Sequence, residues 1–564
     1  MNIYKHNSLV IFFTALFCKV IFFITYLESP FRYFHTVLGL DMKTLLEFSC
    51  FTNLETRLCV PHRWLIYLFY YFNNQEHNTI GVIIVQTLLA IVGAVLLGKC
   101  ARILFNSYKA ELFCGLFYAL YGPTLIYEFS ILQESLIINL LIIGFYFLLK
   151  ARISNYHWKW TIPAGVFLAS TSLGRPATLL LLAAIIFLFS VKIDNFILKV
   201  DNFSTFSNTL VKSISIKYKA LFRISLVILL TFIFGAIFNK VFVNTWSPFF
   251  HSHSYAQVFN YEKDKDNKSN STNEFLNRSC PKDAPKASLV KVGCNALKRM
   301  PQMLLANEIP ENLNYNFLRL KFDLLKVLLG PEVLLTLALT AFIYIILKGH
   351  LLKKEALLIY LILALLPLLC VRDPIGRYRL YIIPFLILLL PSLYTLVKNG
   401  KDFIKAVTIL FIVIVINSLV GWGIGNLRTS DYIAWGLASE SKLNYLLKEN
   451  PKDENKIKLA KKEVLESFAT SWINSNYTHT SSGVNYLLRL LQYGEIPEAV
   501  NVINIGKRTL EPDVYYYYHS LILSRSNPKE SKKLLSNVRV EKIPLLKDKY
   551  YKLQQYLSTV GDKK

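Results

Sequence analysis

The chain has 564 residues, of which 53% are hydrophobic, and its formal net charge is +26. A mean hydropathy of +0.38 excludes an ordinary soluble protein. The basic residues are spread over short loops and the C-terminal tail and form no single stripe, so we expect no nucleic-acid partner and favour anionic membrane lipids instead.

Apolar stretches long enough to cross a bilayer as helices recur over residues 1–425. The first has no small-residue cleavage site behind it, so we interpret it as an uncleaved span. The predicted fold is an all-α polytopic membrane protein with about eleven transmembrane helices. The predicted spans are 8–26, 79–98, 111–127, 130–149, 161–173, 176–191, 221–244, 324–347, 355–371, 378–397 and 403–424.

Alternate loops between these spans are rich in lysine and arginine, which is typical of cytoplasmic loops. The basic set includes Lys99, Arg102, Lys109, Lys150, Arg152, Lys159, Lys192, Lys348, Lys354, Lys398 and Lys401. The other set is then outside: the first outer loop at 27–78, a large outer loop at 245–320, and everything after residue 425. The N-terminus is predicted to be cytoplasmic.

Cysteine positions agree with this sidedness. Cys50, Cys59, Cys280 and Cys294 fall in the outer loops, and the others lie in or beside spans. The pairs Cys50–Cys59 and Cys280–Cys294 are candidate disulfides in an oxidising compartment, with free buried thiols as the alternative.

The tail at 430–564 is predicted to be a soluble helical domain. A helix, a Gly-Glu turn at Gly494, a second helix with Ala499, and Pro512 before a Tyr-rich helix form the pattern of degenerate tetratricopeptide repeats. A generic helical hairpin is the alternative. Either would serve as an accessory module that docks a protein partner.

The first outer loop offers a candidate base. Asp41 opens an amphipathic run close behind the first span, where partial desolvation would raise the pKa of its carboxyl group. The same position suits a helix N-cap. His62, before a second aromatic run, is either a substrate contact or an interfacial anchor.

Three further groups of charges lie at the predicted outer mouths of spans. Glu128 and Glu134 flank a tight turn, and charges at such depth usually face a polar cavity or each other. Arg175 lies between apolar runs, either as a snorkelling side chain or as a cation facing a carrier phosphate. The most specific group contains Arg372, Arg377 and Arg379, whose guanidinium groups suit a lipid-linked phosphate.

Three elements, "YALYGPTLIYEFSILQESL", "AGVFLASTSLGRPATLLL" and "GRYRLYIIPFLILLLP", resemble the GT-C membrane glycosyltransferases. The nearest subset is family 39-like, related to protein mannosyltransferases and the aminoarabinose transferase of lipid A. The resemblance covers roughly residues 1–425, and bacterial members often end in tetratricopeptide-like repeats.

The resemblance implies transfer of a sugar from a polyprenyl-phosphate donor to an extracytoplasmic lipid, glycan or protein, with inversion. Asp41 would be the catalytic base. Arg377 and Arg379, with Arg175, would hold the donor phosphate. Glu128 or Glu134 would shape the sugar or acceptor pocket, with room for a divalent metal. The location implied is the bacterial cytoplasmic (inner) membrane.

Two other classes of protein fit the same composition. A transporter or flippase for lipid-linked sugars needs charged or broken helices near the bilayer midplane, whereas the predicted spans are expected to be apolar in their centres. A non-catalytic assembly protein would use the tail to recruit partners and the spans as an anchor.

Overall fold

The computed structural model of the chain describes residues 6–37, 79–174, 178–193, 214–216, 218–243, 313–347, 358–359, 362, 379–396, 400–419 and 427–561. The described chain is almost entirely helical. It divides into two compact units, one formed by residues 1–25 and 44–426 and the other by residues 26–43 and 427–564.

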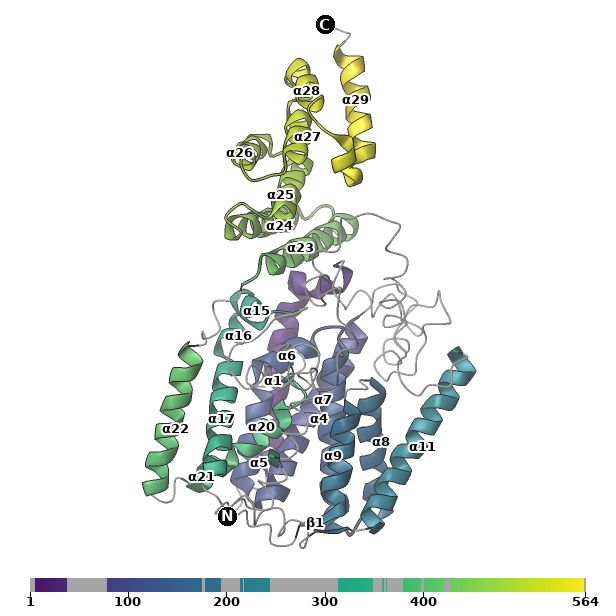
Figure 1. Cartoon of the computed structure of the whole chain (residues 1–564), viewed down its shortest axis with the longest axis vertical. Helices are drawn as coiled ribbons and strands as arrows, with labels where there is room; N and C mark the ends of the chain where they lie inside the picture. Colours follow the sequence, from purple (N-terminus) through teal and green to yellow (C-terminus); the bar gives the residue numbers. More distant parts are fainter. Residues whose placement is uncertain are drawn as a thin grey trace, which may run out of the picture. The chain divides into compact units, whose positions relative to one another are not determined.

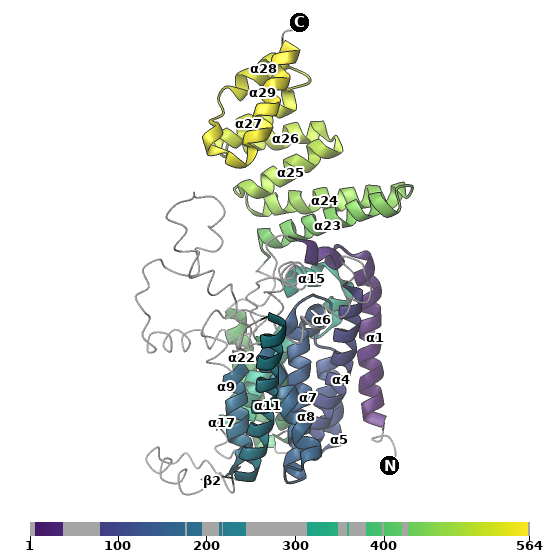
Figure 2. The same cartoon turned by 90° about the vertical axis from the view of Figure 1, so that its right-hand side faces the viewer.

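The first unit is a bundle of apolar helices whose long members run side by side (Figures 1 and 2). Its helices are α1 (Asn7–Glu28, which continues into the second unit), α4 (Ile80–Phe105), α5 (Tyr108–Ala119), α6 (Gly122–Glu128), α7 (Gln133–Ile153), α8 (Trp158–Gly174), α9 (Leu179–Ser190), α11 (Tyr218–Val243), α15 (Tyr315–Lys321), α16 (Asp323–Val327), α17 (Pro331–Leu347), α20 (Ile383–Leu389), α21 (Pro391–Leu396) and α22 (Gly400–Leu419).

Four described helices are long and apolar enough to cross a membrane: α1, α4, α7 and residues 218–237 of α11. Large apolar side chains on α1, α11 and α22 are exposed, including Phe17, Phe234 and Phe411. Such surfaces are rare on soluble proteins, and here a bilayer would solvate them. The prediction of a helical membrane protein is confirmed in this general form, while the number of eleven spans stays a prediction.

Helix α7 lies inside the bundle and packs against α4, α6 and α8. A glycine lets α8 come close, because a Cβ atom on Gly144 would be 2.8 Å from Leu168 Cγ. The polar side chain of Asn139 is satisfied within the helices: its Oδ1 accepts a hydrogen bond from Tyr118 Oη at 3.1 Å, and its Nδ2 donates to Ser135 O at 2.8 Å. Both ends of the Asn139 amide are therefore paired with protein groups, as buried polar groups usually are.

The predicted span 111–127 is not one helix. It breaks between α5 and α6, and the segment before α17 satisfies the backbone at the break. Gly122 N donates to Leu329 O at 2.9 Å, and Leu329 N donates to Leu120 O at 3.0 Å. An irregular backbone inside a membrane protein is stable when protein covers it in this way.

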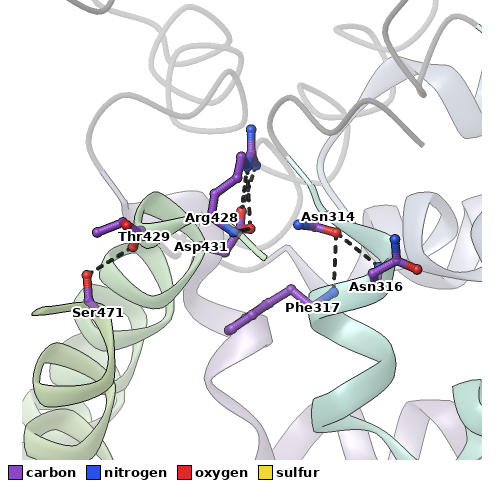
Figure 3. Close-up of polar contacts among 7 residues, drawn as sticks. All are labelled: Asn314, Asn316, Phe317, Arg428, Thr429, Asp431 and Ser471. Carbon is purple, nitrogen blue, oxygen red and sulfur yellow. Dashed lines mark hydrogen bonds and ion pairs between the residues drawn. The ribbon is translucent and has the colours of Figure 1, made fainter. Parts of the chain in front are cut away.

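Proline interrupts another predicted span, 378–397. Pro391 begins α21 directly after α20 and Leu390, because a proline removes a helical hydrogen bond and clashes with the preceding turn. Pro331 begins α17 seven residues later than predicted, behind the short helices α15 and α16. Asn314 caps α15 by accepting hydrogen bonds from the backbone of Asn316 and Phe317 (Figure 3).

The all-α prediction has one exception in the described chain. Strands β1 (Val191–Ile193) and β2 (Ile214–Ile216) pair antiparallel, with Lys192 opposite Ser215. They follow α9 and precede α11, in the basic segment that we predicted to be a cytoplasmic loop.

The second unit contains a chain of helices in which each packs on the next along the sequence. They are α23 (Thr429–Glu449), α24 (Glu454–Asn474), α25 (Thr480–Tyr493), α26 (Ile496–Gly506), α27 (Pro512–Leu523), α28 (Pro528–Leu535), the short 3₁₀ turns η6 (Val540–Lys542) and η7 (Pro544–Leu546), and α29 (Lys547–Gly561).

The residues predicted to end and begin helices in this domain do so in the structure. Gly494 ends α25 with φ of +82°, a conformation that suits glycine, and Pro512 begins α27. Ala499 on α26 is buried in the core. At the start of the domain, Arg428 and Asp431 pair across the first turn of α23, and Ser471 Oγ donates to Thr429 O (Figure 3). Membership of the tetratricopeptide class stays a prediction.

A piece of the first outer loop belongs to the same unit. The 3₁₀ helix η2 (Pro30–Thr36) follows α1 and packs on α23. If the spans are as predicted, this contact requires an even number of them between residues 36 and 429. The predicted set, with its spans from 79–98 to 403–424, satisfies this condition.

Candidate functional site

Charged side chains are buried at the corner where α6 meets α7. Glu128 is the last residue of α6 and is 1% exposed, while Glu134 lies in the first turn of α7 and is 0% exposed. A carboxylate at a helix N-terminus such as that of α7 is favoured by the helix dipole, whereas one at a C-terminus is not. Glu128 therefore needs a compensating cation.

That cation is Lys19. It lies within α1, and its Nζ forms an ion pair with Glu128 Oε2. Lys19 is only 3% exposed, so both charges are removed from solvent. Burying either charge alone would be strongly unfavourable, and in the pair each charge compensates the other.

Helix α1 presents Lys19 because its buried residues recur at helical spacing: Ala15, Lys19, Phe22 and Tyr26 form one stripe. The ring of Phe22 meets Phe129, which lies in the turn directly after Glu128, with centroids 4.8 Å apart. Apolar and ionic contacts therefore hold α1 and this turn together.

A second polar side chain holds the same turn from α4. Gln86 Nε2 donates hydrogen bonds to Glu128 O at 3.0 Å and to Ser130 O at 2.9 Å. Both carbonyl groups follow the end of α6 and would otherwise lack the partners that a continuing helix provides. Gln86 thus fixes the backbone from which Glu128 projects.

The two carboxylate oxygens of Glu128 differ: Oε2 accepts a hydrogen bond from Lys19, and Oε1 does not. Among the described residues, no hydrogen-bond partner contacts the buried Glu128 Oε1. A carboxylate oxygen in a low-dielectric interior accepts hydrogen bonds from hydroxyl groups strongly, since water does not compete. Glu128 Oε1 is therefore an acceptor with unused hydrogen-bonding capacity at this corner.

Arg379 is the third predicted site residue that the structure describes. It lies just before α20, which packs on α4, α5 and α17, and it is 4% exposed. A guanidinium group stays charged at any relevant pH, so its burial places a permanent positive charge inside the bundle. The structure thus buries three predicted site residues, on α6, on α7 and before α20.

The other predicted site residues, Asp41, His62, Arg175, Arg372 and Arg377, lie outside the described residues, as do both candidate disulfides. Cys18, Cys100 and Cys114 are free and buried. Within the described part of the chain, no group of three or more His, Cys, Asp or Glu side chains could hold a metal ion.

The sequence interpretation missed Lys19 and Gln86. It treated the spans as apolar in their centres, and this is wrong for α1, where Lys19 interrupts a 22-residue helix that is otherwise almost free of charge. An ionisable residue within a membrane helix is itself a sign of a functional or paired site. That signal could have revealed Lys19, although not its partner.

Fold and site together define an α-helical membrane protein with a buried charged corner and a helical C-terminal domain. No family model, no curated protein and no solved structure matches the chain.

Proposed function

We propose that this protein is a membrane glycosyltransferase that moves a sugar from a polyprenyl-phosphate donor to an acceptor outside the cytoplasm. The observation that carries the proposal is the burial of Glu128, Glu134 and Arg379 inside a bundle of membrane helices. These are positions at which the GT-C resemblance calls for sugar and phosphate contacts. Buried charges are costly in a membrane and are retained where a polar ligand uses them.

In the proposed reaction, an acceptor hydroxyl oxygen attacks the anomeric carbon of the donor. The bond between that carbon and the phosphate oxygen breaks, and the carrier phosphate leaves with the electron pair. The carboxylate of Asp41 takes the hydroxyl proton, a role that requires hydrogen-bond reach of the acceptor. A single displacement of this kind inverts the anomeric centre.

The other residues have binding roles in this proposal. Arg379, with Arg175, Arg372 and Arg377, neutralises the carrier phosphate as it leaves, since guanidinium groups match phosphate oxygens in bidentate fashion. Glu128 Oε1 and Glu134 accept hydrogen bonds from sugar or acceptor hydroxyl groups. His62 contributes a further substrate contact from the first outer loop.

The experiment is a transfer assay with purified full-length protein in detergent and a panel of radiolabelled polyprenyl-phosphate monosaccharides. One donor should be turned over, and Asp41→Asn should reduce turnover by about 10²–10⁴-fold, the usual contribution of a general base. Arg379→Ala should raise the KM for the same donor.

The matched control is Glu47→Gln, which makes the same carboxylate-to-amide change six positions along the same loop and should retain activity. Full activity in Asp41→Asn would remove Asp41 from the mechanism. Absence of turnover with every donor by a folded protein would argue against a glycosyltransferase.

One observation favours a second candidate, a transporter of lipid-linked sugars. The Lys19–Glu128 pair joins a buried lysine of the membrane helix α1 to the end of α6, and transporters use such charges along their substrate paths. The test is movement of a fluorescent polyprenyl-phosphate sugar across the membrane of liposomes that contain the protein. Movement that is lost in Lys19→Met, with no transfer product formed, would favour the transporter over the glycosyltransferase.

A further inference from the structure

The beginning of the first outer loop is attached to the C-terminal domain by side-chain contacts. The hydroxyl oxygens of Thr36, the last residue of η2, and Ser441, on α23, are hydrogen-bonded at 2.9 Å. These two residues are 405 positions apart in the sequence. Both lie in the second compact unit.

Aromatic contacts extend this attachment along α23. Phe34 meets Trp435 edge to face, with ring centroids 5.9 Å apart, and Tyr33 meets Tyr445 at 6.0 Å. The guanidinium carbon of Arg32 lies 5.8 Å from the centroid of the Tyr445 ring. Trp435 is itself fixed, because its Nε1 donates to Glu463 Oε1 on α24 at 3.1 Å.

Residues 30–36 need these contacts to keep their shape. The hydrogen bonds of a 3₁₀ helix are poorly aligned, so such helices are usually short. The seven residues of η2 make it longer than most. Phe31 and Phe34 are both buried: Phe31 packs on Tyr26 and on Phe34, and Phe34 packs on Trp435 of α23. The surface of α23 therefore contributes contacts that hold this segment in place.

We infer that α23 is a positioning element for the first outer loop, with Trp435, Ser441 and Tyr445 as its positioning residues. Asp41 follows Thr36 by five positions, so the extended chain limits the distance between them to about 18 Å. Fixing Thr36 on α23 restricts where the proposed base can lie. This role in transfer rests on the proposed function, whereas the attachment itself does not.

The attachment is tested first by cross-linking in the full-length protein. Thr36→Cys combined with Ser441→Cys should form a disulfide on mild oxidation, because the two side chains meet within the range that a disulfide spans. Protection of both new thiols from a maleimide reagent is the readout, with each single variant as the reference for native cysteines. Thr36→Cys with Ser558→Cys, on α29, should stay reduced.

The role in positioning is tested with Tyr445, which is 43% exposed and so tolerates replacement. Tyr445→Ala should speed hydrogen exchange at the amides of residues 34–37 by about tenfold and lower turnover at least tenfold with donor KM unchanged, since small displacements of a reacting group have large effects on rate. Tyr445→Phe, which keeps the ring, should have the hydrogen-exchange rates and the turnover of the wild-type protein. Tyr551→Ala, at 50% exposed on α29, is the matched control and should change neither.

Failure of the cross-link together with unchanged exchange in Tyr445→Ala would overturn the attachment. A cross-link accompanied by full turnover in Tyr445→Ala would overturn the role in positioning. If the wild-type protein transfers no sugar, the proposed function fails by itself, and cross-linking and exchange still decide whether α23 holds the loop.

Discussion

Lys19 Nζ on α1 donates to Glu128 Oε2 at the end of α6, and both side chains are buried. The pair joins the first helix of the bundle to the corner that carries the candidate site. Two opposite charges in a low-dielectric interior depend on each other, since each one alone would be an uncompensated buried charge.

Removing one charge of this pair should destabilise the protein more, per substitution, than removing both charges together. Lys19→Met or Glu128→Gln should each lower the free energy of unfolding by about 3–5 kcal/mol, while the double variant should lose less than the sum of the two. Thermal unfolding in detergent measures all three. The exposed pair Lys326–Asp323 on α16 is the control, and Asp323→Asn should cost less than about 1 kcal/mol. Additive losses at Lys19 and Glu128 would show that the two charges are independent.

Replacing Gln86 should loosen the turn after α6. Gln86→Leu removes both hydrogen bonds to Glu128 O and Ser130 O and leaves two buried carbonyl groups unsatisfied. A loss of about 1–3 kcal/mol for each group is expected, seen as a lower melting temperature. Thr408→Val removes a side-chain hydrogen bond on the exposed face of α22 and should change the melting temperature little. Equal melting temperatures for the two variants would contradict the role of Gln86.

The C-terminal domain should lose one stabilising contact in acid. Asp513 accepts hydrogen bonds from Arg539 N at 2.8 Å and Arg539 Nη2 at 3.0 Å. The hydrogen bond from the Arg539 side chain holds the pKa of the Asp513 carboxyl below its usual value. The stabilisation is therefore complete above the unfolded-state pKa, near 4, and disappears as the pH falls through the folded-state pKa.

Asp513→Asn should consequently destabilise α27 and η6 at pH 7, by about 1.5–3 kcal/mol, and the difference from wild type should shrink below about pH 4. Hydrogen exchange of the full-length protein at several pH values measures this difference. Asp453→Asn is the control. The pKa of Asp453 is lowered mainly by the backbone N–H of Lys456 at the exposed start of α24, so its loss should follow the same pH direction with a smaller effect. A difference that grows in acid would contradict the ion pair.

The contact between η2 and α23 makes a prediction about membrane sidedness. Glu28→Cys at the end of α1 and Tyr551→Cys on α29 should react with a membrane-impermeant maleimide in intact cells. Lys109→Cys and Arg152→Cys, at the basic ends of α5 and α7, should react only after permeabilisation, as the distribution of lysine and arginine predicts. Labelling of the parent protein measures the background from its eight native cysteines and is subtracted. Labelling of Glu28→Cys and Tyr551→Cys from opposite sides would exclude the contact.

Hydropathy was sufficient to predict the long helices α1, α4, α7 and α11, because each is a run of predominantly apolar residues long enough to cross a membrane. It could not predict the break between α5 and α6. The residue that stabilises this break, Leu329, is about 200 positions away, and no local pattern records such a partner. Propensity describes a segment, whereas the break depends on tertiary contacts.

The candidate site was predictable in part for the same reason. Glu128, Glu134 and Arg379 stand out as charges beside apolar runs, so their burial could be expected. The choice of Lys19 as the partner of Glu128 could not, because 109 positions separate the two residues and only the packing of α1 joins them. The attachment of η2 to α23 could likewise not be predicted, since neither segment contains a sequence pattern that identifies the other as its partner.

The separation of Thr36 and Ser441 by 405 positions also sets an order of events during synthesis, because about 20–80 s of translation at 5–20 residues per second separates the two. During that interval the nascent chain has no α23, and Phe31 and Phe34 lack the surface that buries them. A chain that stops early keeps this aromatic segment uncovered permanently. Chaperones and proteases that recognise exposed apolar residues can thus distinguish an unfinished chain from a complete one at its N-terminal end.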